Sequence, residues 1–136
     1  MKYLFDTDVL SELLRRAPRS QLIRRLAGVA IEDQATSSIT VGELIYGAHR
    51  LGQRGHDLVD RIERTLLANL LLLAFDALAA RVYGELRASL EREGRPIGDA
   101  DTRIAAIALA RDLVVVTGNV RHFASIDGLR VENWLD

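Results

Sequence analysis

The side chains in this sequence that are best suited to chemistry, by their type and spacing, are three acids: Asp6, Glu43 and Asp101. Carboxylates packed together repel one another, and each raises its neighbours' pKa unless a cation lies between them. Oxygen ligands in a chain without cysteine favour the hard cations Mg²⁺ and Mn²⁺ over zinc. Such a cation can activate water for attack on a phosphodiester. If the fold brings these carboxylates together, the predicted chemistry is metal-dependent phosphodiester hydrolysis.

Positioning side chains from distant segments requires ordered strands and helices, and the sequence shows both. Short apolar runs typical of buried strands alternate with segments whose apolar residues repeat at helical spacing. This alternation implies a parallel sheet covered by helices on both faces. We therefore predict an α/β fold with three α/β/α layers and a parallel sheet of about five strands. The expected strands are residues 2–5, 35–39, 71–75, 113–118 and 129–134, and the expected helices are 8–14, 19–28, 40–51, 58–70, 76–93 and 99–112.

The candidate residues fall at the same edge of this predicted sheet. In an open α/β sheet, ligands bind beyond the carboxyl ends of the strands. The first and fourth expected strands end in polar residues, the second is followed by an acid within a few residues, and two acids open the helix that leads into the fourth. We expect one rim formed by Asp6, Glu43, Asp99, Asp101, Thr117 and Asn119.

Several of these acids also have a purely local interpretation. Asp8 is well placed as the N-cap of the first helix, and either Asp99 or Asp101 could cap the helix that they open. Thr40 and Glu43 match the S/T-x-x-E pattern, so Glu43 could complete a capping box. The acid that ends the first strand is harder to explain in this way, because Asp8 already provides a cap.

Other polar residues are expected to support the rim or to contact a substrate. Thr7 and Thr117 could orient ligands or water, and Asp8 and Asp99 could support the same site. Arg50 and His122 are candidates for contact with RNA phosphates. A lone histidine in a loop and an arginine on a solvated helix face are more often inert, so both interpretations stay open.

The composition limits the possible partners. The formal net charge is −1, so the charge of the whole chain does not indicate a nucleic-acid binder, and any such binding must depend on local patches. All basic residues except Lys2 are arginine, whose planar fork suits phosphate. The longest apolar run, residues 70–75, is too short to span a bilayer, and no signal peptide is seen. We expect a cytoplasmic protein with no membrane partner.

Four segments in the same order along the chain resemble the PIN domain family, and specifically the VapC-type toxins of bacterial toxin–antitoxin pairs. Together they touch almost the full length of the sequence, which the resemblance makes a single PIN domain over residues 1–136. The segments are 5-FDTDVLSELL-14, 38-SITVGELIYGAHRL-51, 96-PIGDADTRIAAIALAR-111 and 116-VTGNVRHFASIDGLRVENW-134.

The resemblance implies a magnesium-dependent ribonuclease, with manganese as a possible substitute. It assigns Asp6, Glu43 and Asp101 as metal ligands and places the family's fourth acidic position near Asn119. His122 stands where the family often has an acid. The resemblance also implies a VapB-type antitoxin whose C-terminal tail covers the site, and a homodimer, for which the apolar helices of residues 40–70 are candidate contacts.

Two other functions remain open at this point. Residues 6-DTDVL-10 match D-x-D-x-V, the nucleophile motif of haloacid dehalogenase-like phosphatases, with Asp6 as the nucleophile. Such enzymes also need a downstream basic residue, usually lysine, and a late acidic pair for Mg²⁺. The only lysine here is Lys2, which lies upstream, and nothing after Val116 supplies an acidic pair at a strand end. The third possibility is a non-catalytic PIN-like module that binds RNA or a partner.

Overall fold

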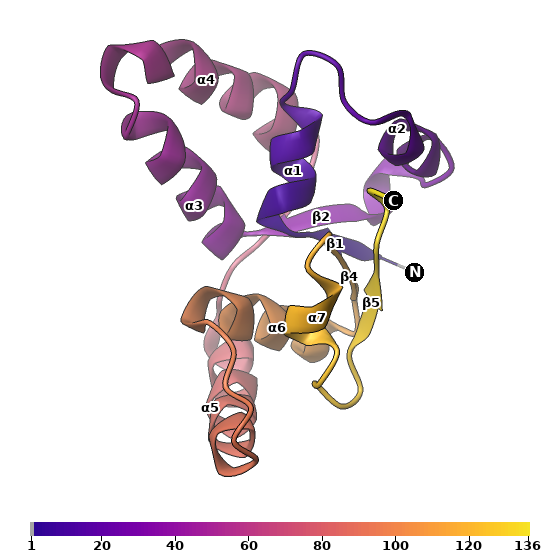
Figure 1. Cartoon of the computed structure of the whole chain (residues 1–136), viewed down its shortest axis with the longest axis vertical. Helices are drawn as coiled ribbons and strands as arrows, with labels where there is room; N and C mark the ends of the chain where they lie inside the picture. Colours follow the sequence, from indigo (N-terminus) through magenta and orange to yellow (C-terminus); the bar gives the residue numbers. More distant parts are fainter. Residues whose placement is uncertain (1) are drawn as a thin grey trace.

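Within residues 2–136, five short strands pair side by side into one parallel sheet. The computed structural model describes residues 2–136. All four strand pairings are parallel, and the order across the sheet is β3-β2-β1-β4-β5 (Figure 1). The predicted parallel sheet of about five strands is thereby confirmed. The strands are β1 (Tyr3–Phe5), β2 (Gln34–Ser37), β3 (Leu71–Leu73), β4 (Val114–Val116) and β5 (Arg130–Glu132).

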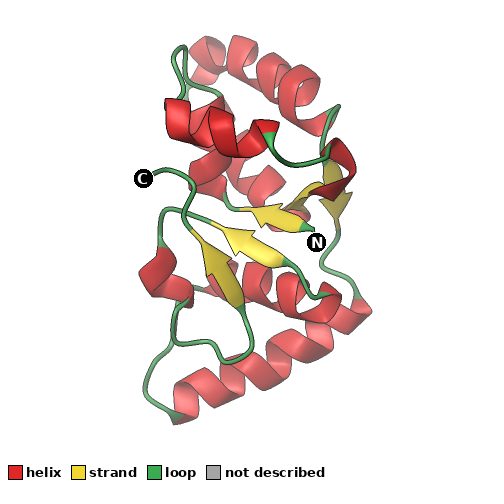
Figure 2. Cartoon of the chain, turned by 90° about the vertical axis from the view of Figure 1, so that its right-hand side faces the viewer, coloured by secondary structure: helices red, strands yellow, loops and turns green. Residues whose placement is uncertain are grey.

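Helices cover both faces of the sheet, which confirms the predicted α/β/α layers (Figure 2). The four N-terminal helices lie on one face, and α5 and α6 lie on the other with α7 beside them (Figure 1). Within residues 2–136, no helix is long and apolar enough to cross a membrane. The helices are α1 (Thr7–Leu13), α2 (Ser20–Ala27), α3 (Ser38–His49), α4 (His56–Arg61), α5 (Ala77–Arg92), α6 (Asp99–Arg111) and α7 (Val120–Phe123). Two 3₁₀ turns are η1 (Ile31–Asp33) and η2 (Gly52–Gly55), and η3 (Ile62–Leu67) is a π-helical segment.

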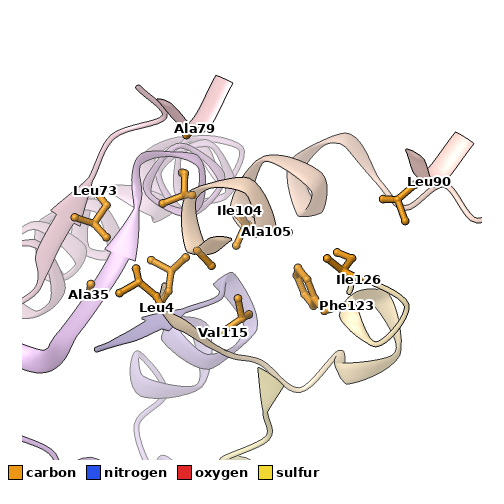
Figure 3. Close-up of a cluster of buried hydrophobic side chains, with 13 residues drawn as sticks. Leu4, Ala35, Leu73, Ala79, Leu90, Ile104, Ala105, Val115, Phe123 and Ile126 are labelled. Atoms are coloured by element: carbon orange, nitrogen blue, oxygen red, sulfur yellow. The ribbon is translucent and has the colours of Figure 1, made fainter. Parts of the chain in front are cut away.

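Two hydrophobic cores form because neighbouring residues of a strand point to opposite faces of the sheet. Leu4 and Val115 face the cluster shared with α5 and α6 (Figure 3). Phe5 and Val116 face the second cluster, which includes residues of α1 and α3 and also Trp134. Strands buried on both faces must be apolar throughout, which explains the continuous run in β4.

The strand order creates one switch point, between β1 and β4. The chain adds β2 and β3 on one side of β1 and then crosses to add β4 and β5 on the other. Phe5 pairs with Val116, and the Asp6 N–H donates to the Val116 carbonyl at 2.9 Å. Ligands of open α/β sheets bind at such a point, beyond the carboxyl ends of the strands. The residues that follow these two strands, Asp6 and Thr117, are therefore neighbours there.

The prediction that Asp8 caps the first helix is wrong. The N-cap of α1 is Asp6, whose Oδ1 accepts from the Thr7 N–H at 2.8 Å. Asp8 lies in the first helical turn instead. The helix begins almost directly after β1, so the residue that follows the strand, Asp6, is also the N-cap of the helix. The prediction that Asp99 or Asp101 caps α6 is also wrong, because the N-cap position of that helix is Gly98.

The capping-box interpretation of Thr40 and Glu43 is also wrong. Helix α3 begins two residues earlier than predicted, at Ser38, and its N-cap is Ser37. The Ser37 hydroxyl accepts from the Thr40 N–H at 3.0 Å, so Thr40 is inside the helix and cannot cap it. The Glu43 side chain is consequently free for another partner.

Replacing the cap residue by Ser37→Ala should lower the free energy of unfolding by about 1 kcal/mol, as for other N-cap serines. The reason is the loss of the acceptor for the Thr40 N–H at a position where Ser37 is fully buried. Urea unfolding followed by circular dichroism measures the change. The matched control is Ser11→Ala at an exposed serine within α1, and equal stability of the two variants would contradict the capping role.

Candidate active site

A pocket of about 690 Å³ lies at the switch point, where the carboxyl ends of the strands meet α1, α3, α6 and α7. It brings together the three predicted metal ligands and Asn119 of the predicted rim, from four separate segments of the chain. It also includes Thr7, Asp8 and His122 from the other predicted positions. The lining residues are Asp6, Thr7, Asp8, Ser11, Glu12, Arg15, Glu43, Asp101, Asn119 and His122.

Asp6 is a buried carboxylate, with only 4% of the residue exposed. Its Oδ2 accepts from the Thr117 hydroxyl at 2.8 Å, and its Oδ1 accepts from the Thr7 N–H. Burial raises the pKa of Asp6 from 3.8 to about 6, and the charges of Asp8 and Asp101 add to the rise. The ionised form of Asp6 is disfavoured, because the two hydrogen bonds only partly offset the loss of water.

The other two acids of the predicted ligand set are held by side chains from different elements. The Thr7 hydroxyl donates to Glu43 Oε1 at 2.6 Å, which joins the start of α1 to α3. Asp101 Oδ2 lies 2.8 Å from Nδ1 of His122, which joins α6 to α7. Each acid therefore has one oxygen engaged by the protein in this arrangement.

The loop after β4 is held by Asp8 and Thr117. Asp8 Oδ2 accepts from the Gly118 N–H at 2.8 Å, and the Thr117 hydroxyl accepts from the Asn119 N–H at 2.9 Å. A Cβ atom at Gly118 would lie 2.7 Å from Asp8 Oδ2 and 2.9 Å from Leu135 Cδ1, so a side chain there would force the Asp8 and Leu135 side chains to move. Asp8 therefore supports the rim, and it does so by bonding to the loop.

Asp99 and Arg50 lie outside the lining of this pocket. Asp99 accepts from the Tyr83 hydroxyl at 2.5 Å and forms an ion pair with Arg103 at 3.0 Å. The hydrogen bond from Tyr83 holds the pKa of Asp99 below its ordinary value, and the charges of Arg103 and Arg87 contribute. The Arg50 guanidinium lies over the Tyr46 ring, 5.7 Å from its centroid. The structure does not bring these two predicted residues to the site.

Comparison with known proteins identifies the family of this chain. A family model described as the PIN domain matches residues 3–129. The chain belongs to the PIN domain family.

Related PIN domain proteins are similar over almost the whole chain. The tRNA(fMet)-specific endonuclease VapC of Shigella flexneri is 34% identical, and the alignment covers 98% of each protein. The DNA-bound VapBC structure from Salmonella typhimurium has a TM-score of 0.89 at 36% identity, and it covers 98% of both chains. The FitAcB structure from Neisseria gonorrhoeae has a TM-score of 0.88 at 34% identity, with 97% of each chain covered.

Nucleases of the PIN family generally use divalent metal ions, and the donor set of this pocket fits one. Asp6, Glu43 and Asp101 supply oxygen donors only, and Asp6 is a buried carboxylate whose pKa is raised chiefly by the loss of water and further by the charges of Asp8 and Asp101. Within residues 2–136, no three acidic, histidine or cysteine side chains lie close enough to hold an ion as they stand. A cation would therefore have to draw these side chains closer together, and the carboxylate oxygens that Thr7 and His122 leave unbonded are the ones available to it.

Sequence reasoning missed three residues of this PIN domain pocket: Ser11, Glu12 and Arg15. Glu12 is buried, with 6% exposed, and its Oε2 accepts from the Arg19 N–H at 2.9 Å. It also pairs with Arg15 at 3.4 Å. A signal was present, because residues four apart share a helix face and Glu12 follows Asp8 by four. Its burial and its bond to Arg19 were not foreseeable from that spacing.

Proposed function

We propose that this protein is a VapC-type toxin that acts as a metal-dependent endoribonuclease. The observation that carries the proposal is the joint position of Asp6, Glu43, Asp101 and Asn119 around one pocket at the switch point of a PIN domain. The names of relatives, among them tRNA(fMet)-specific endonuclease VapC and Ribonuclease VapC, support hydrolysis of RNA. We extend the PIN domain assignment to residues 1–136 as one domain.

The residues of the pocket would divide the work between binding and positioning. Asp6, Glu43 and Asp101 would hold Mg²⁺ or Mn²⁺, which when bound activates water and stabilises the leaving oxygen. Thr117 keeps one oxygen of Asp6 in place, and Thr7 does the same for Glu43. Asn119 completes the rim through the loop that Asp8 holds.

The proposal includes a protein inhibitor and a second copy of the chain. Two similar structures are a VapBC complex and a FitAcB structure. An acidic pocket that is open to solvent suits an arginine or lysine from the C-terminal tail of a VapB-type antitoxin. The homodimer is a separate expectation, and a light-scattering mass equal to one chain at micromolar concentration would contradict it.

RNA cleavage by purified protein with Mg²⁺, Mn²⁺ or EDTA tests the function. We expect discrete fragments of cellular RNA with either metal and none with EDTA. Asp101→Asn should lower the rate by about 1000-fold, since a bound cation contributes several kcal/mol to such reactions. The control is Asp127→Asn, at an exposed acid outside the pocket, which should cleave like the wild type.

Other outcomes would favour the alternatives. Binding of Mn²⁺ by the wild type without any RNA cleavage would support the non-catalytic RNA-binding or partner-binding module. An acid-labile phosphate on Asp6 would support the phosphatase. Membership of the PIN family speaks against that phosphatase, and so does the absence from the sequence of any lysine after Lys2.

Thr117→Val should reduce both stability and cleavage. The change leaves Asp6 Oδ2 and the Asn119 N–H without their partner at a fully buried position. We expect a loss of about 1–3 kcal/mol in the free energy of unfolding. Cleavage should fall by about 10–100-fold, as for other residues that orient metal ligands.

The matched control is Thr36→Val on β2. Thr36 is also fully buried, and its hydroxyl donates to the Phe5 carbonyl at 2.8 Å instead of to the Asp6 carboxylate. It should lose a similar amount of stability and keep its cleavage rate. Equal loss of cleavage in both variants would show that the effect of Thr117→Val is only on folding.

A further inference from the structure

His122 makes a contact that neither the fold nor the proposed ligand set requires. It lies on α7, and its Nδ1 is 2.8 Å from Asp101 Oδ2 on α6. The neighbouring Phe123 is fully buried and anchors α7 in the core. The backbone of α7 is thereby fixed next to α6, while 57% of the His122 side chain remains exposed.

The contact contributes little to folding, because exposed pairs of this kind are worth at most about 1 kcal/mol. Its effect is on Asp101. An ionised carboxylate can only accept hydrogen bonds, so the hydrogen lies on His122 Nδ1. A further carboxylate at this position would repel Asp101, whereas an imidazole N–H binds one of its oxygens and restricts its rotation.

We propose that His122 is a positioning residue, which holds Asp101 Oδ2 through Nδ1 so that the other carboxylate oxygen is presented to a divalent cation. The inference depends on the proposed function, because it assigns a role at the same site. Carboxylates that ligate metals are commonly held by such outer hydrogen bonds. Here, however, the donor comes from α7, a four-residue helix that begins directly after Asn119.

The test is a titration with Mn²⁺ followed by electron paramagnetic resonance, in which the signal of the free aqueous ion falls as the ion binds. His122→Asn places its side-chain N–H near the position of Nδ1, whereas His122→Gln places its amide near Nε2. We expect His122→Gln to bind Mn²⁺ about 10–100-fold more weakly than the wild type. His122→Asn should bind within a few-fold of the wild type, and His49→Gln, at an exposed histidine of α3, is the matched control.

Cleavage gives a second readout. Because His122→Gln should act through metal affinity, saturating Mn²⁺ should return its cleavage rate to nearly that of the wild type. Thermal unfolding in EDTA checks that the variants fold.

The remaining outcomes separate this inference from the function itself. Wild-type affinity in His122→Gln would overturn the positioning role and leave the nuclease proposal intact. Normal binding by His122→Gln together with loss in His122→Asn would overturn it in favour of direct ligation through Nε2. Failure of the wild type to bind Mn²⁺ would overturn both proposals. Binding that is lost in Asp6→Asn would place the measured ion in this pocket.

Discussion

Asp6→Asn should make the metal-free protein more stable at pH 8 while it lowers RNA cleavage by about 1000-fold or more. The two effects have one cause. Asp6 is 4% exposed, and burial raises its pKa to about 6, so the ionised form is disfavoured in the folded protein. Asparagine keeps an acceptor for the Thr7 N–H and removes the charge that the proposed cation needs.

The gain in stability should depend on pH in a defined direction. The pKa of Asp6 is about 6 in the folded protein against 3.8 for an ordinary aspartate. The folded wild type therefore binds the proton more tightly than the unfolded chain does. This contribution to stability is complete below pH 3.8 and is lost as the pH rises through 6. We expect Asp6→Asn to exceed the wild type by up to about 3 kcal/mol at pH 8, and to match it near pH 4.

Urea unfolding in EDTA at both pH values, together with the cleavage assay, measures the two effects. Asp127→Asn is again the control, because it removes one carboxylate at an exposed position outside the pocket. A variant that is less stable than the wild type at pH 8 would show that Asp6 is mainly structural. A stable variant with full cleavage would remove Asp6 from the ligand set.

Trp134→Ala should cost about 3–5 kcal/mol of folding free energy, the range found for buried aromatic residues. Trp134 is 1% exposed, and its ring centroid lies 5.0 Å from that of Tyr3 and 5.5 Å from that of Phe5. Its Nε1–H donates to Glu132 Oε1 at 2.9 Å, and the Arg25 guanidinium lies over the ring at 5.1 Å. One side chain thus joins the end of the chain to β1 and α2.

The measurement is urea unfolding by circular dichroism, since Trp134 is the only tryptophan and fluorescence would disappear with it. Trp134→Phe is the matched variant, because it keeps an aromatic ring against Tyr3 and Phe5 and loses the N–H. It should cost clearly less than Trp134→Ala. A loss below about 1 kcal/mol in Trp134→Ala, the size of a typical surface change, would contradict the anchoring role.

The sequence by itself determined the layered α/β architecture and the edge of the sheet at which the acids meet. Both follow from local patterns. The apolar run in β4 can only belong to a strand buried on both faces, and the repeat in α6 belongs to a helix packed against it. Parallel strands share one carboxyl edge, and the helix that leads into β4 begins at that edge. Asp6 and Asp101 are therefore expected at the same edge without knowledge of the strand order.

Only the tertiary structure decided which partner each polar side chain takes. Asp8 was predicted to be a cap, but it accepts from Gly118, a residue 110 positions away, while Asp6 caps α1. The Thr7–Glu43 and His122–Asp101 contacts also join distant segments. A hydrogen bond requires its donor and acceptor to lie within about 3 Å of each other at a suitable angle. That geometry depends on strand order, register and helix starts to within a residue, whereas periodicity in the sequence defines the elements only to within a few residues.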